Sequence, residues 1–225
     1  MANGCHIVID TPPDFREQVL EHGVERVDAV FFTHAHADHL FGFDDIRRFN
    51  TLQRMEIPVW ASAETCTQLR NIFAYALRPD PVPGVFRPRV VIHEISGSVV
   101  LPGRDGGGPV TVTPLPVEHG VCDTLGFRID ADGSSLGYVP DCKQMSEEVT
   151  ALLKGVDVMI LDGLRRRPHP THYTLAETLG KLAEIGARQS YVVHICHELD
   201  HAETAAELPD GVALSYDGLR IGVSG

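Results

Sequence analysis

Residues 28–39 read Asp-Ala-Val-Phe-Phe-Thr-His-Ala-His-Ala-Asp-His. The apolar and aromatic residues of Asp28–Thr33 predict a buried strand that leads directly into His34. Three histidines and one aspartate follow within six positions, next to alanines that leave space around them. Imidazole and carboxylate groups are ligands that zinc, manganese and iron accept, and a strand end is a rigid place from which to present them. A polar loop with chance histidines would produce this pattern in roughly one chain in 100 to 1,000, so the stretch predicts a metal site.

The predicted elements around this motif alternate between strands and helices. A strand at His6–Asp10 precedes a helix from Asp14 to about His22, which Gly23 can end. Further helices are predicted at Phe43 to about Leu52, Ala63 to about Leu77 and Thr174 to about Ile185, and further strands at Pro58–Trp60, Val90–Ile95, Val110–Leu115, Val156–Leu161 and Gln189–Val193. Arg78–Pro88 contains four prolines and is predicted to be a loop.

Two predicted hairpins complete the pattern and decide the fold class. They comprise Leu125–Ile129 with Ser135–Val139, and Val212–Tyr216 with Arg220–Val223. Strands therefore occur both in hairpins and before helices. This mixture favours two mixed sheets packed face to face with helices outside, over a doubly wound parallel sheet. We predict an α/β (α+β) fold in a single domain over residues 1–225, because no linker composition divides the chain.

Composition and charge limit the classes of protein and partner. The chain has 225 residues, 43% of them hydrophobic and 22% charged, so it can bury a core and is not a disordered chain. Its net charge of −12 argues against duplex nucleic acid as a partner. No apolar run approaches the roughly 20 residues of a membrane span, so no membrane association is expected. Five scattered cysteines and a start without a signal-peptide pattern predict a cytoplasmic location.

Three further residues of metal-ligand type follow predicted strands, namely His119, Asp141 and His194. Each of them alone is more often a polar loop residue than a ligand. Because all three lie at strand ends in a chain that already carries the motif at residues 34–39, their joint occurrence favours a further set of ligands. One short cluster can hold two metal ions only if such ligands come from elsewhere in the chain.

The motif at residues 34–39, followed in order by His119, Asp141 and His194, resembles the metallo-β-lactamase superfamily. The resemblance implies a four-layer αββα sandwich of two mixed sheets and a site for two divalent metal ions. Zinc, manganese and iron all fit histidine and aspartate ligands. The ligands that it implies are His34, His36 and His119 for one ion, Asp38, His39 and His194 for the other, and Asp141 as a bridge to both.

A narrower resemblance, to the PhnP-type phosphodiesterases, covers most of the chain. The stretches that carry it are Ile9–Asp14, Thr33–His39, Gly42–Arg47, Asp162–His172 and Asp217–Leu219. That group acts on cyclic phosphodiesters of ribose. The resemblance therefore implies a dinuclear metal-dependent hydrolase whose partner is a small, cyclic or nucleotide-like phosphodiester. It also implies that His172 contacts the substrate phosphate and acts as a general acid, with Asp141 as the second catalytic residue.

Two alternatives to a phosphodiesterase stay open. One is another hydrolase on the same metals that acts on a lactam, a thioester or RNA ends. The other is a truncated metal-binding protein without turnover, because members of the group usually begin with about fifty further residues that form the first strands. We accordingly expect the strand at Ile7–Ile9 to lie at an exposed edge or to pair with a second subunit in a homodimer.

A few remaining residues have two interpretations each. Cys142 and Cys196 adjoin proposed ligands and are predicted to be small buried residues and not thiolate ligands. His197 either matches the structural-zinc ligand of some relatives or is a spare polar residue. The arginines of Arg165–Arg167 either bind phosphate through their guanidinium groups or form a solvated charge run.

Overall fold

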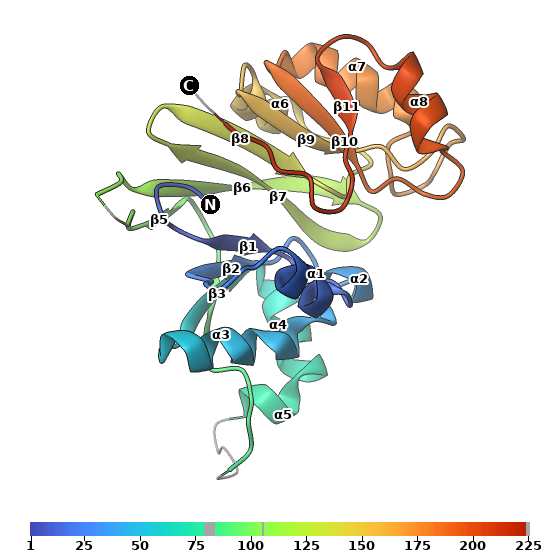
Figure 1. Ribbon diagram of the computed structural model, residues 1–225. Coiled ribbons are helices and arrows are strands. Elements are labelled where there is room, and N and C mark those ends of the chain that lie inside the picture. The colour runs from blue at the N-terminus through green and yellow to red at the C-terminus, as the bar shows by residue number, and fades with distance from the viewer. Residues whose placement is uncertain (79–83, 105, 224–225) are drawn as a thin grey trace. The chain divides into compact units, whose positions relative to one another are not determined.

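Two compact units make up the described part of the chain, which comprises residues 1–78, 84–104 and 106–223 of a computed structural model. The first unit comprises Met1–Ser96 with Gly103–Gly106, and the second comprises Gly97–Pro102 with Gly107–Gly225. Figure 1 colours the chain by residue number, so the first unit runs from blue into green and the second continues to red. Each unit contains its own sheet and its own buried core.

The sheet of the first unit is parallel throughout the described residues. Its strands, in sheet order, are β1 (Ile7–Ile9), β2 (Ala29–Phe31), β3 (Ile57–Ala61) and β4 (Val90–Glu94). All neighbouring pairs are parallel because helical segments separate successive strands along the chain. The sequence predicted that both sheets would be mixed. Within the described ranges, this sheet contains only parallel pairs. β1 is an edge strand with three half-buried residues.

The helices of the first unit match the three predicted ones, with one interruption, and include a short helix at Ala37–Leu40 that was not predicted. They are α1 (Phe15–Glu21), α2 (Ala37–Leu40), the 3₁₀ helix η1 (Phe43–Asp45), α3 (Ile46–Gln53), α4 (Ala63–Ile72) and α5 (Ala74–Leu77). The Ser62 side chain accepts a hydrogen bond from the backbone N–H three residues later and so begins α4. The helix predicted from Ala63 to Leu77 breaks at Phe73, whose φ of −105° and ψ of 35° are not helical. Its ring packs against Phe43, with 4.7 Å between the ring centroids.

Apolar side chains of the strands and helices together form the core of the first unit. Val30, Ile57 and Val59 contribute from the strands, and Ile46 and Leu69 contribute from α3 and α4; all five are fully buried. β3 alternates buried and half-buried residues, as a strand with one face in the core does. The central part of the predicted loop after α5, residues 79–83, lies outside the described residues.

The sheet of the second unit is mixed and has the order β11-β10-β9-β8-β7-β6-β5. The strands are β5 (Val99–Leu101), β6 (Val110–His119), β7 (Cys122–Ala131), β8 (Ser134–Val139), β9 (Val158–Asp162), β10 (Gln189–Val193) and β11 (Val212–Leu214). Strands β5 to β8 are antiparallel neighbours, and β8 to β11 are parallel neighbours. The predicted hairpin is β7–β8. Its turn places Asp132 and Gly133 at φ values of 47° and 82°, as a tight two-residue turn requires.

The C-terminal part of the second unit differs from the prediction in its pairing. β11 pairs in parallel with β10, and Arg220–Val223 forms no strand, so the predicted second hairpin is absent from the described residues. The helices are α6 (Glu147–Leu153), α7 (Leu175–Ile185) and α8 (His201–Glu207). α7 begins with the predicted capping box of Thr174 and Glu177 and ends at Gly186, whose φ is 68°. No helix in the described ranges is long and apolar enough to cross a membrane.

Candidate functional site

Buried polar groups of the first unit connect the end of β1 to the histidine motif after β2. Thr33 donates its backbone N–H and its hydroxyl to the two oxygens of Asp10, each over 2.8 Å. His39 Nδ1 lies 2.7 Å from Asp10 Oδ2. Because a carboxylate can only accept, Nδ1 carries the hydrogen and Nε2 is the ring nitrogen that can bind a metal. Burial raises the pKa of Asp10, while the hydrogen bonds from His39 and Thr33 act in the opposite direction.

His34 and His36 bring two ring nitrogens together in the same loop. His34 Nδ1 lies 3.0 Å from Thr33 Oγ1, whose own hydrogen goes to Asp10. His34 Nε2 lies 2.8 Å from His36 Nδ1. This is a hydrogen-bond distance, so these two ring nitrogens face each other within the loop. Asp38, which is exposed, places Oδ2 3.6 Å from His39 Nε2.

In the second unit, the Asp141 side chain faces two histidines, His119 and His194, which lie at the ends of two different strands. His119 is the last residue of β6, and its Nδ1 donates to the Thr171 carbonyl oxygen over 2.8 Å. Its Nε2 lies 3.6 Å from Asp141 Oδ2. His194 follows β10 in the left-handed region, with a φ of 60°, and its Nε2 lies 3.5 Å from the same oxygen. Asp141 is 2% exposed, so this carboxylate is held among imidazole groups away from bulk water.

His172 lies among these ligand-type residues of the second unit. Its ring stacks on that of His194, with 4.6 Å between centroids, and meets the ring of His119 edge to face at 4.6 Å. Asp141, His172 and His194 each offer a ligand-type atom, and these atoms lie within 4.8 Å of one another. The geometry therefore allows His172 two roles, as a proton donor beside the metal ligands or as a ligand itself.

Asp162 fixes the orientation of the His172 ring. His172 Nδ1 donates to Asp162 Oδ2 over 2.8 Å, and the Cys142 backbone N–H donates to the same oxygen over 2.9 Å. Asp162 is the last residue of β9 and is fully buried. Burial raises the pKa of Asp162, against the lowering effect of these two hydrogen bonds. The pair leaves Nε2 as the nitrogen of His172 that can exchange a proton.

Thr171 contacts two histidine rings through its backbone, one at the end of β6 and one in its own loop. Its carbonyl oxygen accepts from His119, and its backbone N–H donates to His169 Nδ1 over 3.3 Å. The His169 ring lies 5.0 Å from that of His172. Burial and the neighbouring His172 lower the pKa of His169, which favours its neutral form. In that form the accepting Nδ1 leaves the hydrogen on Nε2.

The three consecutive arginines after β9 form surface ion pairs. Arg167 Nη2 lies 2.5 Å from Glu198 Oε1, and Arg165 Nη1 lies 3.5 Å from the same oxygen. Arg166 Nη2 lies 2.7 Å from Glu207 Oε2. Because each of these three guanidinium groups already pairs with one of two glutamates, the geometry favours the charge-run interpretation over a phosphate site.

Of the two cysteines near the ligands, Cys142 is buried as predicted, whereas Cys196 is only half-buried. Cys142 is fully buried, and burial raises the pKa of its thiol, so the thiolate that would bind a metal is disfavoured. Cys196 is half-buried and accepts a long hydrogen bond of 3.5 Å from the backbone N–H of Glu198. Within the described residues, no metal-capable group includes a cysteine or His197.

Sequence reasoning did not identify the groups that orient the histidines. Asp10 and Asp162 each lie at the end of an apolar strand, the same signal that identified the ligand-type residues. Extending that signal to every acidic residue at a strand end would have found both. Thr171 acts through its backbone, which no side-chain pattern reports.

Residues 6–195 of the chain match the family model described as "Beta-lactamase superfamily domain". The chain is 32% identical over 219 residues to an octanoyltransferase of Porphyromonas gingivalis, a match that covers 96% of this chain and 42% of that protein. The chain thus spans less than half the length of this curated relative.

Two solved structures are similar to the described fold. A diphosphatase from the PhnP family has a TM-score of 0.82 and 34% identity, over 95% of this chain and 77% of that chain. Zn²⁺-bound PqqB from Methylobacterium extorquens has a TM-score of 0.71 and 20% identity, over 96% of this chain and 83% of that chain. The second likeness shows a shared fold alone. With the family model matched along most of its length, the chain belongs to the β-lactamase superfamily domain family and has the metallo-β-lactamase fold.

Proposed function

We propose that the chain is a dinuclear metal-dependent hydrolase that cleaves a small, cyclic or nucleotide-like phosphodiester. The observation that carries the proposal is the buried hydrogen bond between Asp162 and His172, beside the ligand-type residues Asp141 and His194. It combines a positioned proton donor with metal-binding groups. Membership of the family supports a metal-dependent hydrolase, and the likeness to a PhnP-family diphosphatase supports a phosphate-containing substrate.

The proposed ligands form two sets of three that share one aspartate. They are His34, His36 and His119 for one ion, Asp38, His39 and His194 for the other, and Asp141 for both. The order of the motifs along the chain and the family membership support these sets. The hydrogen bonds that His39 donates to Asp10 and that His119 donates to the Thr171 carbonyl oxygen are compatible with these sets, because each determines which ring nitrogen can bind a metal. Zinc, manganese and iron all suit such ligands, so each of these ions is a candidate to test.

When bound, two divalent ions would lower the pKa of a coordinated water and stabilise charge on phosphoryl oxygens. His172 would donate a proton from Nε2 to the leaving alkoxide oxygen or stabilise the charge that develops there. Asp162 would keep the ring in one orientation and stabilise its protonated form, since the carboxylate accepts from Nδ1. The net charge of −12 supports a small substrate over duplex nucleic acid, and the scattered cysteines support a cytoplasmic location.

The test compares three classes of substrate on purified protein of known metal content. We expect hydrolysis of bis(p-nitrophenyl) phosphate in the presence of zinc or manganese, and none of a chromogenic β-lactam. An octanoyl thioester is the third substrate, because one relative is named an octanoyltransferase. Hydrolysis of the lactam or the thioester in preference to the phosphodiester would contradict the proposed substrate class. Bound metal without any turnover would favour a metal-binding protein.

The variant His172→Ala separates the two roles that the geometry allows. We expect it to keep its metal and to lose about 10²–10⁴-fold in kcat, as the loss of one positioned proton donor does. Loss of metal together with activity would make His172 a ligand. His201→Ala is the matched control, because His201 is an exposed histidine of α8 and bonds only the Ser215 carbonyl oxygen among the described residues.

A further inference from the structure

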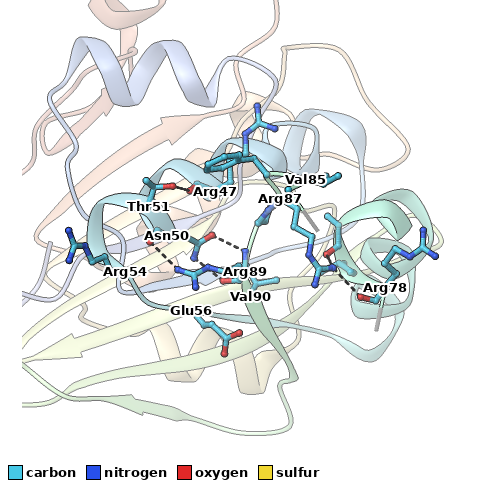
Figure 2. Close-up of a pocket in the computed structure, with 15 residues that line it drawn as sticks. Arg47, Asn50, Thr51, Arg54, Glu56, Arg78, Val85, Arg87, Arg89 and Val90 are labelled. Carbon is cyan, nitrogen blue, oxygen red and sulfur yellow. Dashed lines mark hydrogen bonds between the residues drawn. The ribbon is translucent and has the colours of Figure 1, made fainter. Parts of the chain in front are cut away.

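A cavity of about 810 Å³ lies in the first unit, at the N-terminal ends of β3 and β4. α3, the end of α5 and the segment Gly84–Val90 line it, as Figure 2 shows. Five of its described lining residues are arginines, namely Arg47, Arg54, Arg78, Arg87 and Arg89. The one acidic side chain among them is Glu56. The described lining residues thus carry five positive charges and one negative charge, in a chain whose net charge is −12, and Asp44 pairs with one of the five arginines, Arg47.

One buried side chain, that of Asn50, forms the hydrogen bonds that frame the cavity. Asn50 is 2% exposed, and its side-chain amide donates to the carbonyl oxygens of Met55 and Arg89 over 2.9 Å and 2.8 Å. Its side-chain oxygen accepts from the Arg89 backbone N–H over 2.9 Å. This one side chain therefore ties the segment before β4 to α3, and Figure 2 shows the link as dashed lines. The arginines of that segment project from a fixed backbone.

Two arginines are oriented by groups that leave their charge uncompensated. Arg87 Nη1 donates to the carbonyl oxygens of Ala76 and Arg78 over 2.6 Å and 3.0 Å. Arg89 Nη2 donates to the Asn50 carbonyl oxygen over 3.3 Å. Carbonyl oxygens are neutral, and a guanidinium group has five N–H donors, so most donors of both arginines remain available to a ligand.

The other three arginines differ in how they are paired. Arg47 forms an ion pair with Asp44 over 2.5 Å. Arg54 and Arg78 have no acidic partner for their side chains within the described residues. Arg54 follows α3 at a φ of 55°, a left-handed position where glycine is the usual residue. An arginine there costs backbone energy and puts a cation at the rim of the cavity, which suggests a functional reason for the strain.

The cavity and the histidine motif lie at opposite ends of one sheet. Glu56 directly precedes β3, and Val90 is the first residue of β4, whereas His34 follows the C-terminal end of β2. These strands are parallel, and a five-residue strand is about 15 Å long. The cavity is therefore separate from the proposed ligands of the first unit.

We infer that this cavity binds a small ligand of the nucleoside diphosphate class. Guanidinium forks match phosphoryl oxygens, and several of them together favour a ligand with two or more phosphoryl groups. The volume suits a ligand of nucleotide size. Phe86, which lines the cavity and is 74% exposed, offers a flat apolar face on which a base can stack.

Calorimetric titration with ADP tests the inference and needs no turnover, so its result is independent of the proposed hydrolase activity. We expect saturable binding that weakens as the salt concentration rises. Arg54→Gly and Arg78→Ala should each weaken binding by about tenfold, the effect of losing one charged hydrogen-bonding group. Arg54→Gly should also keep or raise the Tm, because glycine is unstrained at this φ. Weaker binding in a variant of equal or greater stability cannot result from unfolding.

Three comparisons complete the design. Arg48 lies on α3, as Arg47 does, but outside the described lining of the cavity. Arg48→Ala should therefore leave the affinity for ADP unchanged. Phe86→Ala should weaken ADP binding and leave pyrophosphate binding unchanged. Asp141→Ala should leave both unchanged. Absence of ADP binding would overturn the inference. So would ADP binding that is lost in Asp141→Ala but retained in Arg54→Gly and Arg78→Ala, because that result would place ADP at the proposed metal centre.

Discussion

Asp10 and Asp162 perform the same task for two different histidines. Each is a buried carboxylate that accepts a hydrogen bond from Nδ1, the first from His39 over 2.7 Å and the second from His172 over 2.8 Å. Each accepts a second hydrogen bond from a backbone N–H, which fixes the carboxylate itself. A ring held in this way presents Nε2 in one direction and in one tautomer.

Asp162→Asn should reduce kcat about 10- to 100-fold while metal content and fold are retained, the usual cost of losing an orienting partner. The amide can accept from His172 but carries no charge to stabilise a protonated ring. The measurements are kcat and bound metal per chain. Asp130→Asn is the control, because Asp130 pairs with Arg128 on β7. Full activity in Asp162→Asn would show that the carboxylate charge has no part in the reaction.

Tyr75 gives a residue-scale test of a different kind. Burial, and then the hydrogen bond that its hydroxyl donates to Asp44, raise the pKa of Tyr75 to about 12. The neutral hydroxyl is thus favoured in the folded chain. Its contribution to stability is complete below the ordinary tyrosine pKa of about 10 and is lost as the pH rises through about 12. An ultraviolet difference titration of the wild type against Tyr75→Phe measures this pKa, and Asp44→Asn should lower it.

At the scale of elements, the loop after β1 is packed so closely that one added methyl group should disturb the metal motif. A Cβ at Gly42 would clash with the Pro12 carbonyl oxygen and lie 2.7 Å from Phe15 Cβ. Gly42 also donates its N–H to the Thr11 carbonyl oxygen over 2.8 Å, and Thr11 adjoins Asp10. A shift here therefore reaches the group that holds His39.

Gly42→Ala should lower the free energy of unfolding by about 1–3 kcal/mol, the range for overpacking, and should reduce metal content. Gly180→Ala is the matched control, and it should raise the free energy of unfolding. Gly180 lies inside α7, and a Cβ there meets no atom within 4 Å. Because alanine favours a helix more than glycine does, this substitution should raise the free energy of unfolding by about 1 kcal/mol. Denaturant unfolding measures both values, and equal effects of the two variants would contradict this packing argument.

Elements with their own local chemistry could be predicted from the sequence. The capping box at Thr174, the tight turn at Asp132 and the strand before His34 depend on neighbouring residues alone. β5 (Val99–Leu101) and α8 (His201–Glu207) were not predicted. β11 looked like half of a hairpin because Asp217-Gly218 is a good turn, yet it pairs with β10 through long-range contacts that local patterns do not encode.

In the candidate site too, local patterns could be predicted and long-range contacts could not. Ligand-type residues could be predicted because they lie at the ends of apolar strands, as His119 ends β6 and His194 follows β10. Which group orients which histidine could not be predicted. Asp10 is 29 positions from His39, and Thr171 is 52 positions from His119, so only the folded chain shows these pairs.

At the scale of the whole molecule, metal binding should stabilise the fold. A ligand that binds only the folded chain adds about 4 kcal/mol at 1,000 times its Kd. Removal of metal by a chelator should therefore lower the Tm, and added zinc or manganese should restore it. Asp141→Ala should lower metal content more than the loss of any single histidine ligand, because it is the one proposed ligand shared by both ions. Metal analysis and thermal melting measure these effects, and full metal occupancy in Asp141→Ala would contradict the bridging role.

The two sheets differ in how far apart along the chain their paired residues lie, and this difference bears on the order of folding. In the second unit, His119 pairs with Cys122 and Ala131 pairs with Ser134, so β6, β7 and β8 associate through two-residue turns. In the first unit, Ile7 pairs with Ala29 and Ile57 with Val90, and each pairing must first close a long loop. Low contact order speeds association, and hairpins form in about 1–10 μs. The β6–β8 meander is therefore the natural nucleus, and pulse-labelled hydrogen exchange should show its amides protected before those of β1–β4.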